Sequence, residues 1–208
     1  MSFFNRIQSY ILPKEIDFFQ NLIKQSQMVL EVIQSLEMAY AGTDHAQALL
    51  LEKLKAAEIL REQNLMELND VLITPIDKEA ISRAYLNLDW ILLSVKHLDV
   101  EIRAYQIHRL EEYANLFRLL SEEAKQIPHC FDLLKQHKFD QVIKLSKEII
   151  ALDDELIHSY SGKVSKLLED QNWVHVMKHK EILSQIKEIS KRMHVCANTI
   201  EDFVFKMN

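Results

Sequence analysis

The chain of 208 residues contains only two glycines and three prolines, and this scarcity limits what it can fold into. Hairpins and tight turns rely on these residue types, because glycine tolerates left-handed backbone angles and proline fixes φ. An all-β or α/β chain of this length would need many more of them. With 48% apolar and 27% charged residues, the chain has the composition of a folded protein. We therefore predict an all-α fold in one domain spanning residues 1–208.

Apolar residues recur at helical spacing in six segments. The predicted helices run from about Pro13 to Tyr40, where Gly42 closes the helix, from Thr43 or Asp44 to Leu68, from Pro75 to the region 99–105, from Tyr105 to Gln126, from Phe139 to Glu169, and from the segment EDQNW to Val204. The interruption at 99–105, with Asp99 as a cap, is expected because one helix from Ile76 to Ile127 would be too long for a compact domain. Pro128 is expected to end the fourth helix, and a short helical piece follows at 130–137.

The segment ITPIDKEAI, which begins at Ile73, predicts the start of the third helix. Thr74 precedes a proline and so is held in the extended geometry that suits an N-cap. Pro75 would then occupy the first helical position, where its missing N–H costs nothing. Asp77 would lie at the third position, near the positive end of the helix dipole. The carboxylate of Asp77 therefore has a structural explanation before any functional one.

Two similar pentapeptides begin the third helix of each half of the sequence. DKEAI (77–81) and HKEIL (179–183) lie about one hundred residues apart. Such an offset indicates a duplicated three-helix unit. The predicted architecture is a helical bundle of two pseudo-repeated units, at about 14–104 and 105–208.

Charge and hydropathy exclude two classes of protein. The net charge is −6 and the cations are scattered, whereas nucleic-acid binding needs a basic face. No apolar run reaches the roughly 18 residues that span a bilayer. The first residues lack the continuous apolar segment of a signal peptide, so a cytoplasmic location is expected. Cys130 and Cys196, far apart in sequence, are expected to be buried thiols.

Three segments carry a resemblance to a known family. The segment ILPKEIDFFQNLIKQ contains Leu12, Pro13, Lys14, Phe18 and Phe19, ITPIDKEAI follows the second helix, and the last helix, KHKEILSQIKEISKRMHVCANTIEDFVFK, contains Cys196, Ala197 and Asn198. These segments resemble the Leu-Pro-Lys start, the Ile-Thr-Pro turn and the final helix of the Pit accessory proteins, the PhoU-like regulators of phosphate transport. The resemblance covers essentially the whole chain.

The resemblance implies a PhoU-like bundle of two three-helix repeats without enzymatic activity. It implies a cytosolic regulator or accessory protein that acts on a membrane phosphate permease of the Pit type, at the inner face of the membrane. In PhoU-like proteins, acid-x-x-x-acid motifs on the second and third helices of each half bind iron or zinc. Two alternatives stay open: a metal-binding (Fe or Zn) bundle with a storage or redox role, and a plain structural adaptor that associates with itself as a homo-oligomer.

This sequence keeps only part of the family's ligand set. The acids that match ligand positions are Glu58, Glu62, Asp89, Asp153, Glu155 and Glu188. Glu58 and Glu62 form the one pair of acids spaced four residues apart, which places both on one helix face. Leu54, Lys191 and Val195 stand where the family has acids, and none of these three side chains binds a divalent cation through oxygen. No bound cofactor is expected, with Fe or Zn as the alternative.

Other arrangements typical of metal sites or catalysis are sparse. His175 and His179 form an HxxxH pair that could bind Zn²⁺ with a further ligand, but the glutamate of an HExxH motif is missing. Glu155 and His158 form the one ExxH, whereas a di-iron bundle needs two and two further glutamates. Two glycines cannot build a phosphate-binding loop. We therefore expect a protein that is not an enzyme.

Overall fold

The computed structural model describes residues 16–40 and 46–207. These residues form six α-helices and no strand, as predicted. The helices are α2 (Phe18–Tyr40), α3 (Ala46–Asp70), α4 (Lys78–Ala104), α5 (Ala114–Lys135), α6 (Phe139–Leu167) and α7 (Trp173–Met207), with a 3-10 helix η1 (Glu111–Tyr113) before α5. The positions expected at Pro13, Gly42, Thr43 and Asp44 lie outside the described residues. Within the described ranges, no helix is long and apolar enough to cross a membrane.

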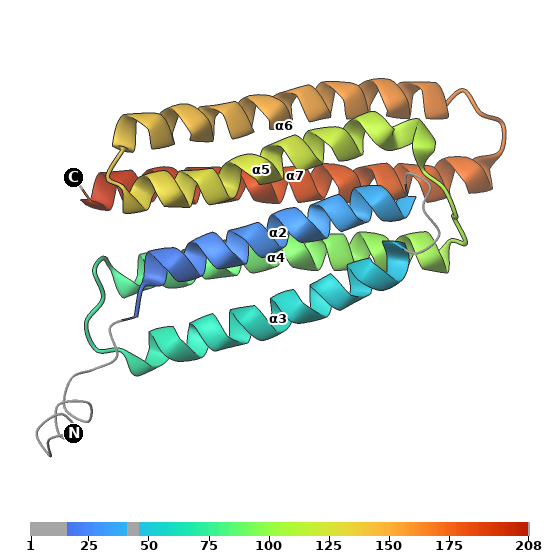
Figure 1. Ribbon diagram of the computed structural model, residues 1–208. Helices are drawn as coiled ribbons and strands as arrows, with labels where there is room; N and C mark the ends of the chain where they lie inside the picture. The colour runs from blue at the N-terminus through green and yellow to red at the C-terminus, as the bar shows by residue number, and fades with distance from the viewer. Residues whose placement is uncertain (1–15, 41–45, 208) are drawn as a thin grey trace, which may run out of the picture.

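The six helices form two antiparallel three-helix units that lie against each other (Figure 1). The first unit is α2, α3 and α4, and the second is α5, α6 and α7. Between the units, α2 packs on α5 and α4 packs on α7, so these four helices form the centre of the bundle. Helices α3 and α6 each pack within their own unit and lie on opposite outer sides. The predicted bundle of two three-helix units is confirmed.

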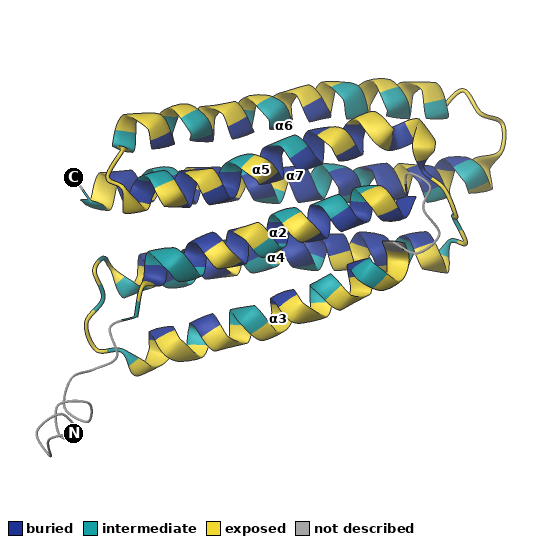
Figure 2. Ribbon diagram, in the orientation of Figure 1, coloured by how far each residue is buried: buried dark blue, intermediate teal, exposed yellow. Residues whose placement is uncertain are grey.

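The outer helices bury one narrow stripe of side chains each, whereas the central helices bury broad faces (Figure 2). Helix α6 buries five residues that alternate in spacings of four and three, namely Val142, Ser146, Ile149, Asp153 and Leu156. This is the spacing of a coiled-coil seam, which keeps one stripe facing its partners. The buried residues of α3 are Leu50, Ala57, Asn64 and Leu68. The polar residues Ser146, Asp153 and Asn64 are therefore inside because their register places them there.

A buried pair of amides joins the three helices of the first unit. Asn64 Nδ2 on α3 donates to Gln25 Oε1 on α2 at 2.9 Å, and Gln25 Nε2 donates to the Tyr85 carbonyl oxygen on α4 at 3.0 Å. Gln25 and Asn64 are both almost completely inaccessible to solvent. A buried amide without partners would destabilise the fold, so these bonds fix the register of α3 against its neighbours.

The third helix begins later than the sequence predicts, which corrects the expected cap. The N-cap is Asp77, whose carboxylate accepts from Glu79 N at 3.1 Å, and Thr74 and Pro75 lie in the preceding loop. Thr74 Oγ1 instead donates to the Ile76 carbonyl oxygen. Aspartate is a strong N-cap residue, and Lys206 of α7 holds its second oxygen at 2.7 Å. The contact with the distant α7 favours the cap at Asp77.

Pro128 does not end a helix, and the separate piece expected at 130–137 is wrong. Helix α5 continues through Pro128 to Lys135. Proline removes one backbone hydrogen bond and crowds the preceding turn, which normally bends or ends a helix. Here Pro128 is buried, and the same face continues with Ile127, Cys130 and Phe131 in the core. Tertiary packing of that face therefore prevails over the local preference.

The predicted break between the third and fourth helices is confirmed, but Asp99 does not cap a new helix. Asp99 lies inside α4 and is buried, and it accepts from Tyr40 Oη at 2.8 Å and pairs with Arg103 at 2.6 Å. The chain leaves α4 through Gln106 at φ 59°, whose N–H bonds to the Arg103 carbonyl. Glycine usually fills this left-handed position after a helix. In this glycine-poor chain a glutamine fills it instead.

Replacing Gln106 with glycine should stabilise the protein. The substitution removes the steric conflict of a side chain at positive φ, and we expect the free energy of unfolding to rise by about 1 kcal/mol. Chemical denaturation at neutral pH measures it. The matched control is Gln136→Gly at the end of α5, where φ is −87° and glycine offers no relief. A destabilised Gln106→Gly variant would contradict this description of the turn.

Candidate functional site

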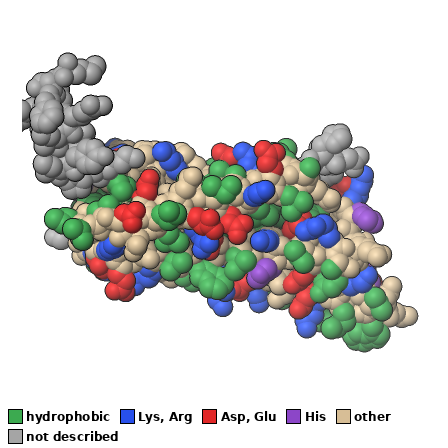
Figure 3. All heavy atoms as spheres, turned by 90° about the horizontal axis from the view of Figure 1, so that it is seen from below, with side chains coloured by type: hydrophobic (Ala, Val, Ile, Leu, Met, Phe, Trp, Pro, Cys, Tyr) green, Lys and Arg blue, Asp and Glu red, His purple; other side chains and the backbone are tan. Residues whose placement is uncertain are grey.

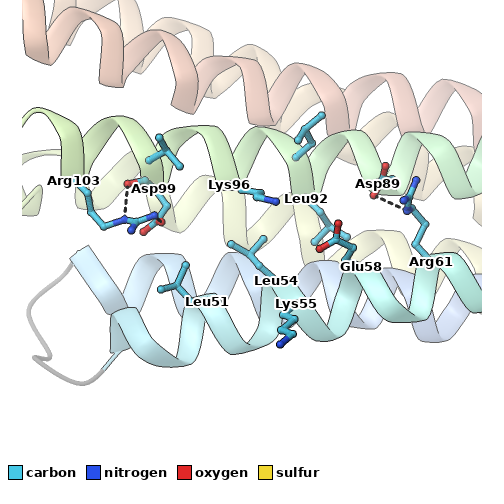
Figure 4. A pocket seen from close by; sticks show the side chains of 12 residues that line it. Leu51, Leu54, Lys55, Glu58, Arg61, Asp89, Leu92, Lys96, Asp99 and Arg103 are labelled. Carbon is cyan, nitrogen blue, oxygen red and sulfur yellow. Dashed lines mark hydrogen bonds and ion pairs between the residues drawn. The ribbon is translucent and has the colours of Figure 1, made fainter.

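A groove of about 310 Å³ runs between α3 and α4 (Figure 4). Its size is in the range of small-ligand sites. The lining combines apolar and charged side chains, namely Leu51, Leu54, Lys55, Glu58, Arg61, Asp89, Leu92, Leu93, Lys96, Asp99, Val100 and Arg103. Successive members on each helix are mostly three or four residues apart, so each helix contributes one face.

Two ion pairs hold two of the three acidic side chains of the groove, Asp89 and Asp99. Arg61 Nε on α3 lies 3.4 Å from Asp89 Oδ1 on α4, and Arg103 Nη2 lies 2.6 Å from Asp99 Oδ2. Burial raises the pKa of Asp89, the Arg61 charge opposes that rise, and the nearby Glu58 charge adds to it. Burial and the hydrogen bond to Asp99 raise the pKa of Tyr40. The Asp99 charge is therefore held by a neutral phenol and an arginine.

Two lysines of the groove form no close ion pair, although the charge of Lys96 acts on Asp89. Lys55 and Lys96, both exposed, make no hydrogen bond or ion pair within the described part of the chain. The lining also includes Leu54, Leu92 and Leu93, and Lys55 points away from α4 (Figure 4). An apolar floor with unpaired cations suits a ligand or peptide that has an apolar body and an anionic group. Over the molecular face on the α3 side, cations and acids are intermixed rather than gathered into a basic patch (Figure 3).

The six acids predicted as metal ligands lie in different surroundings. Glu58 and Asp89 share the groove, and Glu62 is exposed on α3. In the second unit, Asp153 is buried, Glu155 is exposed 3.9 Å from Arg118, and Glu188 pairs with Arg192 at 2.7 Å. Within the described residues, no group of three or more His, Cys, Asp or Glu side chains is placed to hold one metal ion.

A buried carboxyl cluster in the second unit is a feature that the sequence reasoning missed. Ser190 Oγ on α7 lies 2.8 and 3.0 Å from the two carboxyl oxygens of Glu123 on α5, and 2.8 Å from Asp153 Oδ1 on α6. His194 Nδ1 lies 2.7 Å from Asp153 Oδ2. Glu123 and Ser190 are fully buried. The cluster joins α5, α6 and α7, much as the amide pair joins the helices of the first unit.

The geometry of this cluster favours a proton on one of its two carboxyl groups. A serine hydroxyl has a single hydrogen, so it can donate to one carboxyl group while accepting from the other. Burial, together with the Asp153 charge, raises the pKa of Glu123 well above its usual value, against the opposing effect of the Ser190 bond. We therefore expect Glu123 to be protonated, so that its carboxyl group donates to Ser190 Oγ and Ser190 donates to Asp153 Oδ1. The signal available in the sequence was register: Asp153 is flanked by Ile149 and Leu156 on one helical stripe.

Comparison with known proteins identifies the fold. No protein-family model matches the chain. The UPF0111 protein YkaA of Bacillus subtilis is 23% identical over 144 residues, which cover 68% of this chain and 70% of that protein. A PhoU-like protein of Shewanella oneidensis superposes with a TM-score of 0.72 and 13% identity, over 91% of this chain and 99% of that one. A second Shewanella oneidensis structure, named as a PhoU-like phosphate regulatory protein, superposes with a TM-score of 0.71 and 12% identity, with the same coverage. The chain has the PhoU-like fold.

The variant Glu123→Gln tests the shared proton. The wild-type protein takes up a proton on folding above the unfolded pKa of Glu123, so this residue lowers stability as pH rises. Glutamine keeps the shape and donates to Ser190 without that proton. We expect the free energy of unfolding of the variant, relative to that of the wild type, to rise with pH. The rise should be up to about 1.4 kcal/mol for each pH unit over which folded Glu123 stays protonated.

Urea unfolding between pH 5 and pH 8 measures this difference. The matched control is Glu122→Gln, which removes only an exposed pair with Arg118 and should stay within about 0.5 kcal/mol at every pH. A difference between Glu123→Gln and the wild type that does not grow with pH would show that Glu123 is ionised in the folded protein.

Proposed function

We propose that the protein is a non-enzymatic regulator of phosphate transport that acts by binding a membrane phosphate permease. The observation that carries the proposal is the likeness of fold, which extends over 91% of this chain and 99% of a protein named for phosphate regulation. The Ile-Thr-Pro-Ile-Asp segment and the first and last helices, which resemble the Pit accessory proteins, support the same proposal.

The partner that we propose is a permease of the Pit type, contacted from the cytoplasmic side. A regulator of this kind needs a binding surface rather than reacting groups, and the groove between α3 and α4 is our candidate. Its apolar floor can receive the apolar face of a helix, and Lys55 and Lys96 can pair with acids on that helix. Opposite charges of this kind mainly set specificity and the rate of encounter.

The storage or redox alternative needs several side chains that share metal ions. Of the six candidate acids only Glu58 and Asp89 share a site, and several of the six are engaged in ion pairs, so we do not propose that role. A structural adaptor that pairs with itself stays a distinct hypothesis. Sedimentation of the purified chain over a range of concentrations tests this adaptor hypothesis, because self-association through an apolar face depends on concentration.

Charge reversal in the groove tests the proposed binding. We expect the double variant Lys55→Glu and Lys96→Glu to bind permease-containing membrane vesicles at least tenfold more weakly than the wild type, because both cations would become repulsive. The matched control reverses two exposed lysines on the other outer helix, Lys144→Glu and Lys147→Glu, and should bind as the wild type does. Co-sedimentation with vesicles that contain or lack the permease measures binding. Equal binding to both kinds of vesicle would contradict the permease proposal.

A further inference from the structure

Two histidine rings lie together at the start of α7, outside the groove and the carboxyl cluster. His175 and His179 are four residues apart and therefore lie on one face of the helix. Their ring centroids are 4.2 Å apart, with the planes tilted by 42°. His179 is buried, and the His175 side chain is about two-fifths exposed, so the pair opens to solvent on the His175 side.

Each ring is held through its Nδ1 atom by groups from another segment. His175 Nδ1 lies 2.9 Å from Asp170 Oδ2, in the loop between α6 and α7. His179 Nδ1 lies 2.8 Å from Tyr113 Oη and 3.3 Å from Glu112 Oε1, both in η1. The Asp170 carboxylate is itself fixed, because its Oδ1 accepts from Asn172 N at 2.8 Å. Both Nδ1 atoms therefore lie against groups from other segments: Tyr113 Oη is the hydrogen-bond partner of His179, and Asp170 is at ion-pair distance from His175.

The Nε2 atoms of both rings remain available. Across the described residues, neither Nε2 atom takes part in a hydrogen bond or ion pair. In metal-binding histidines one ring nitrogen binds the ion, and the other contacts a neighbouring polar group that fixes the orientation of the ring.

We propose that His175 and His179 bind a divalent transition metal ion through their Nε2 atoms, with Asp170 and Tyr113 beside their Nδ1 atoms. Imidazole nitrogen suits Zn²⁺, Ni²⁺ and Cu²⁺, whereas Mg²⁺ and Ca²⁺ need oxygen ligands. Water completes the coordination, because no group of three or more His, Cys, Asp or Glu side chains in the described ranges could hold one ion. The site is thus open, unlike a closed structural zinc site with four protein ligands.

This site differs from the acid-rich motifs in its ligands and place. It contains none of the six acids predicted as ligands. Its ion would bridge two neighbouring turns of α7. The contacts of the rings with Asp170 and Glu112 connect those turns to the α6–α7 loop and to η1. Binding to the folded state alone raises stability in proportion to the logarithm of the metal concentration. Metal should therefore stabilise this end of the bundle.

Titration of the untagged full-length protein with ZnCl₂ and NiCl₂ tests the proposal. Calorimetry should show one ion per chain, and the thermal unfolding midpoint should rise with metal and return on addition of EDTA. Equal concentrations of MgCl₂ and CaCl₂ should leave the midpoint unchanged. Absence of Zn²⁺ and Ni²⁺ binding by the wild-type protein would overturn the proposal.

Matched variants locate the ion. His175→Ala and His179→Gln should each lose the binding, whereas the double variant His129→Ala and His158→Ala, which removes two exposed imidazoles on α5 and α6, should retain it. Asp170→Asn keeps both rings and the bond to Asn172 N, and should weaken binding by about 10- to 100-fold. Circular dichroism checks that each variant is folded. Unchanged binding by folded His175→Ala would place the ion elsewhere and contradict the assignment.

Discussion

The packing of four helices against one another is the constraint on which the rest of the molecule depends. Helices α2 and α5 make one contact between the units, and α4 and α7 make the other. The broad apolar faces of α2, α4, α5 and α7 are buried in these contacts. Helices α3 and α6 therefore pack from outside through narrow stripes of buried residues. A narrow stripe specifies register weakly, and each unit adds a buried polar contact to fix it. Gln25 and Asn64 do this in the first unit, and Glu123, Ser190 and Asp153 do it in the second.

Much of the fold could be predicted from the sequence, because helical periodicity and the scarcity of glycine act along the whole chain. What could not be predicted depends on contacts between distant residues. Pro128 reads locally as a helix end, yet the apolar face around it continues to Leu134. Asp99 reads as a cap, yet Tyr40, from another helix, holds it inside α4. The N-cap of α4 is Asp77 rather than the predicted Thr74, and Lys206 of α7 contacts Asp77.

The candidate site was predictable only in part. Matching acids to a family's ligand positions led to Glu58 and Asp89, which do share the groove, although Asp89 pairs with Arg61 there. The same approach could not identify Glu123, because a single glutamate on an apolar stripe has no motif. Register was the usable signal for Asp153, and it indicates burial rather than metal binding. The histidine pair had a motif, but the groups that lie against its Nδ1 atoms come from η1 and from the α6–α7 loop, which spacing within α7 does not reveal.

The outer position of α3 and the groove beside it provide the surface through which we propose that this PhoU-like bundle regulates phosphate transport. The most direct test of that central claim is the rate of radiolabelled phosphate uptake in cells that lack the protein. We predict a changed rate of uptake, restored when the wild-type chain is supplied from a plasmid. Identical uptake with and without the chain, under both limiting and abundant phosphate, would contradict it.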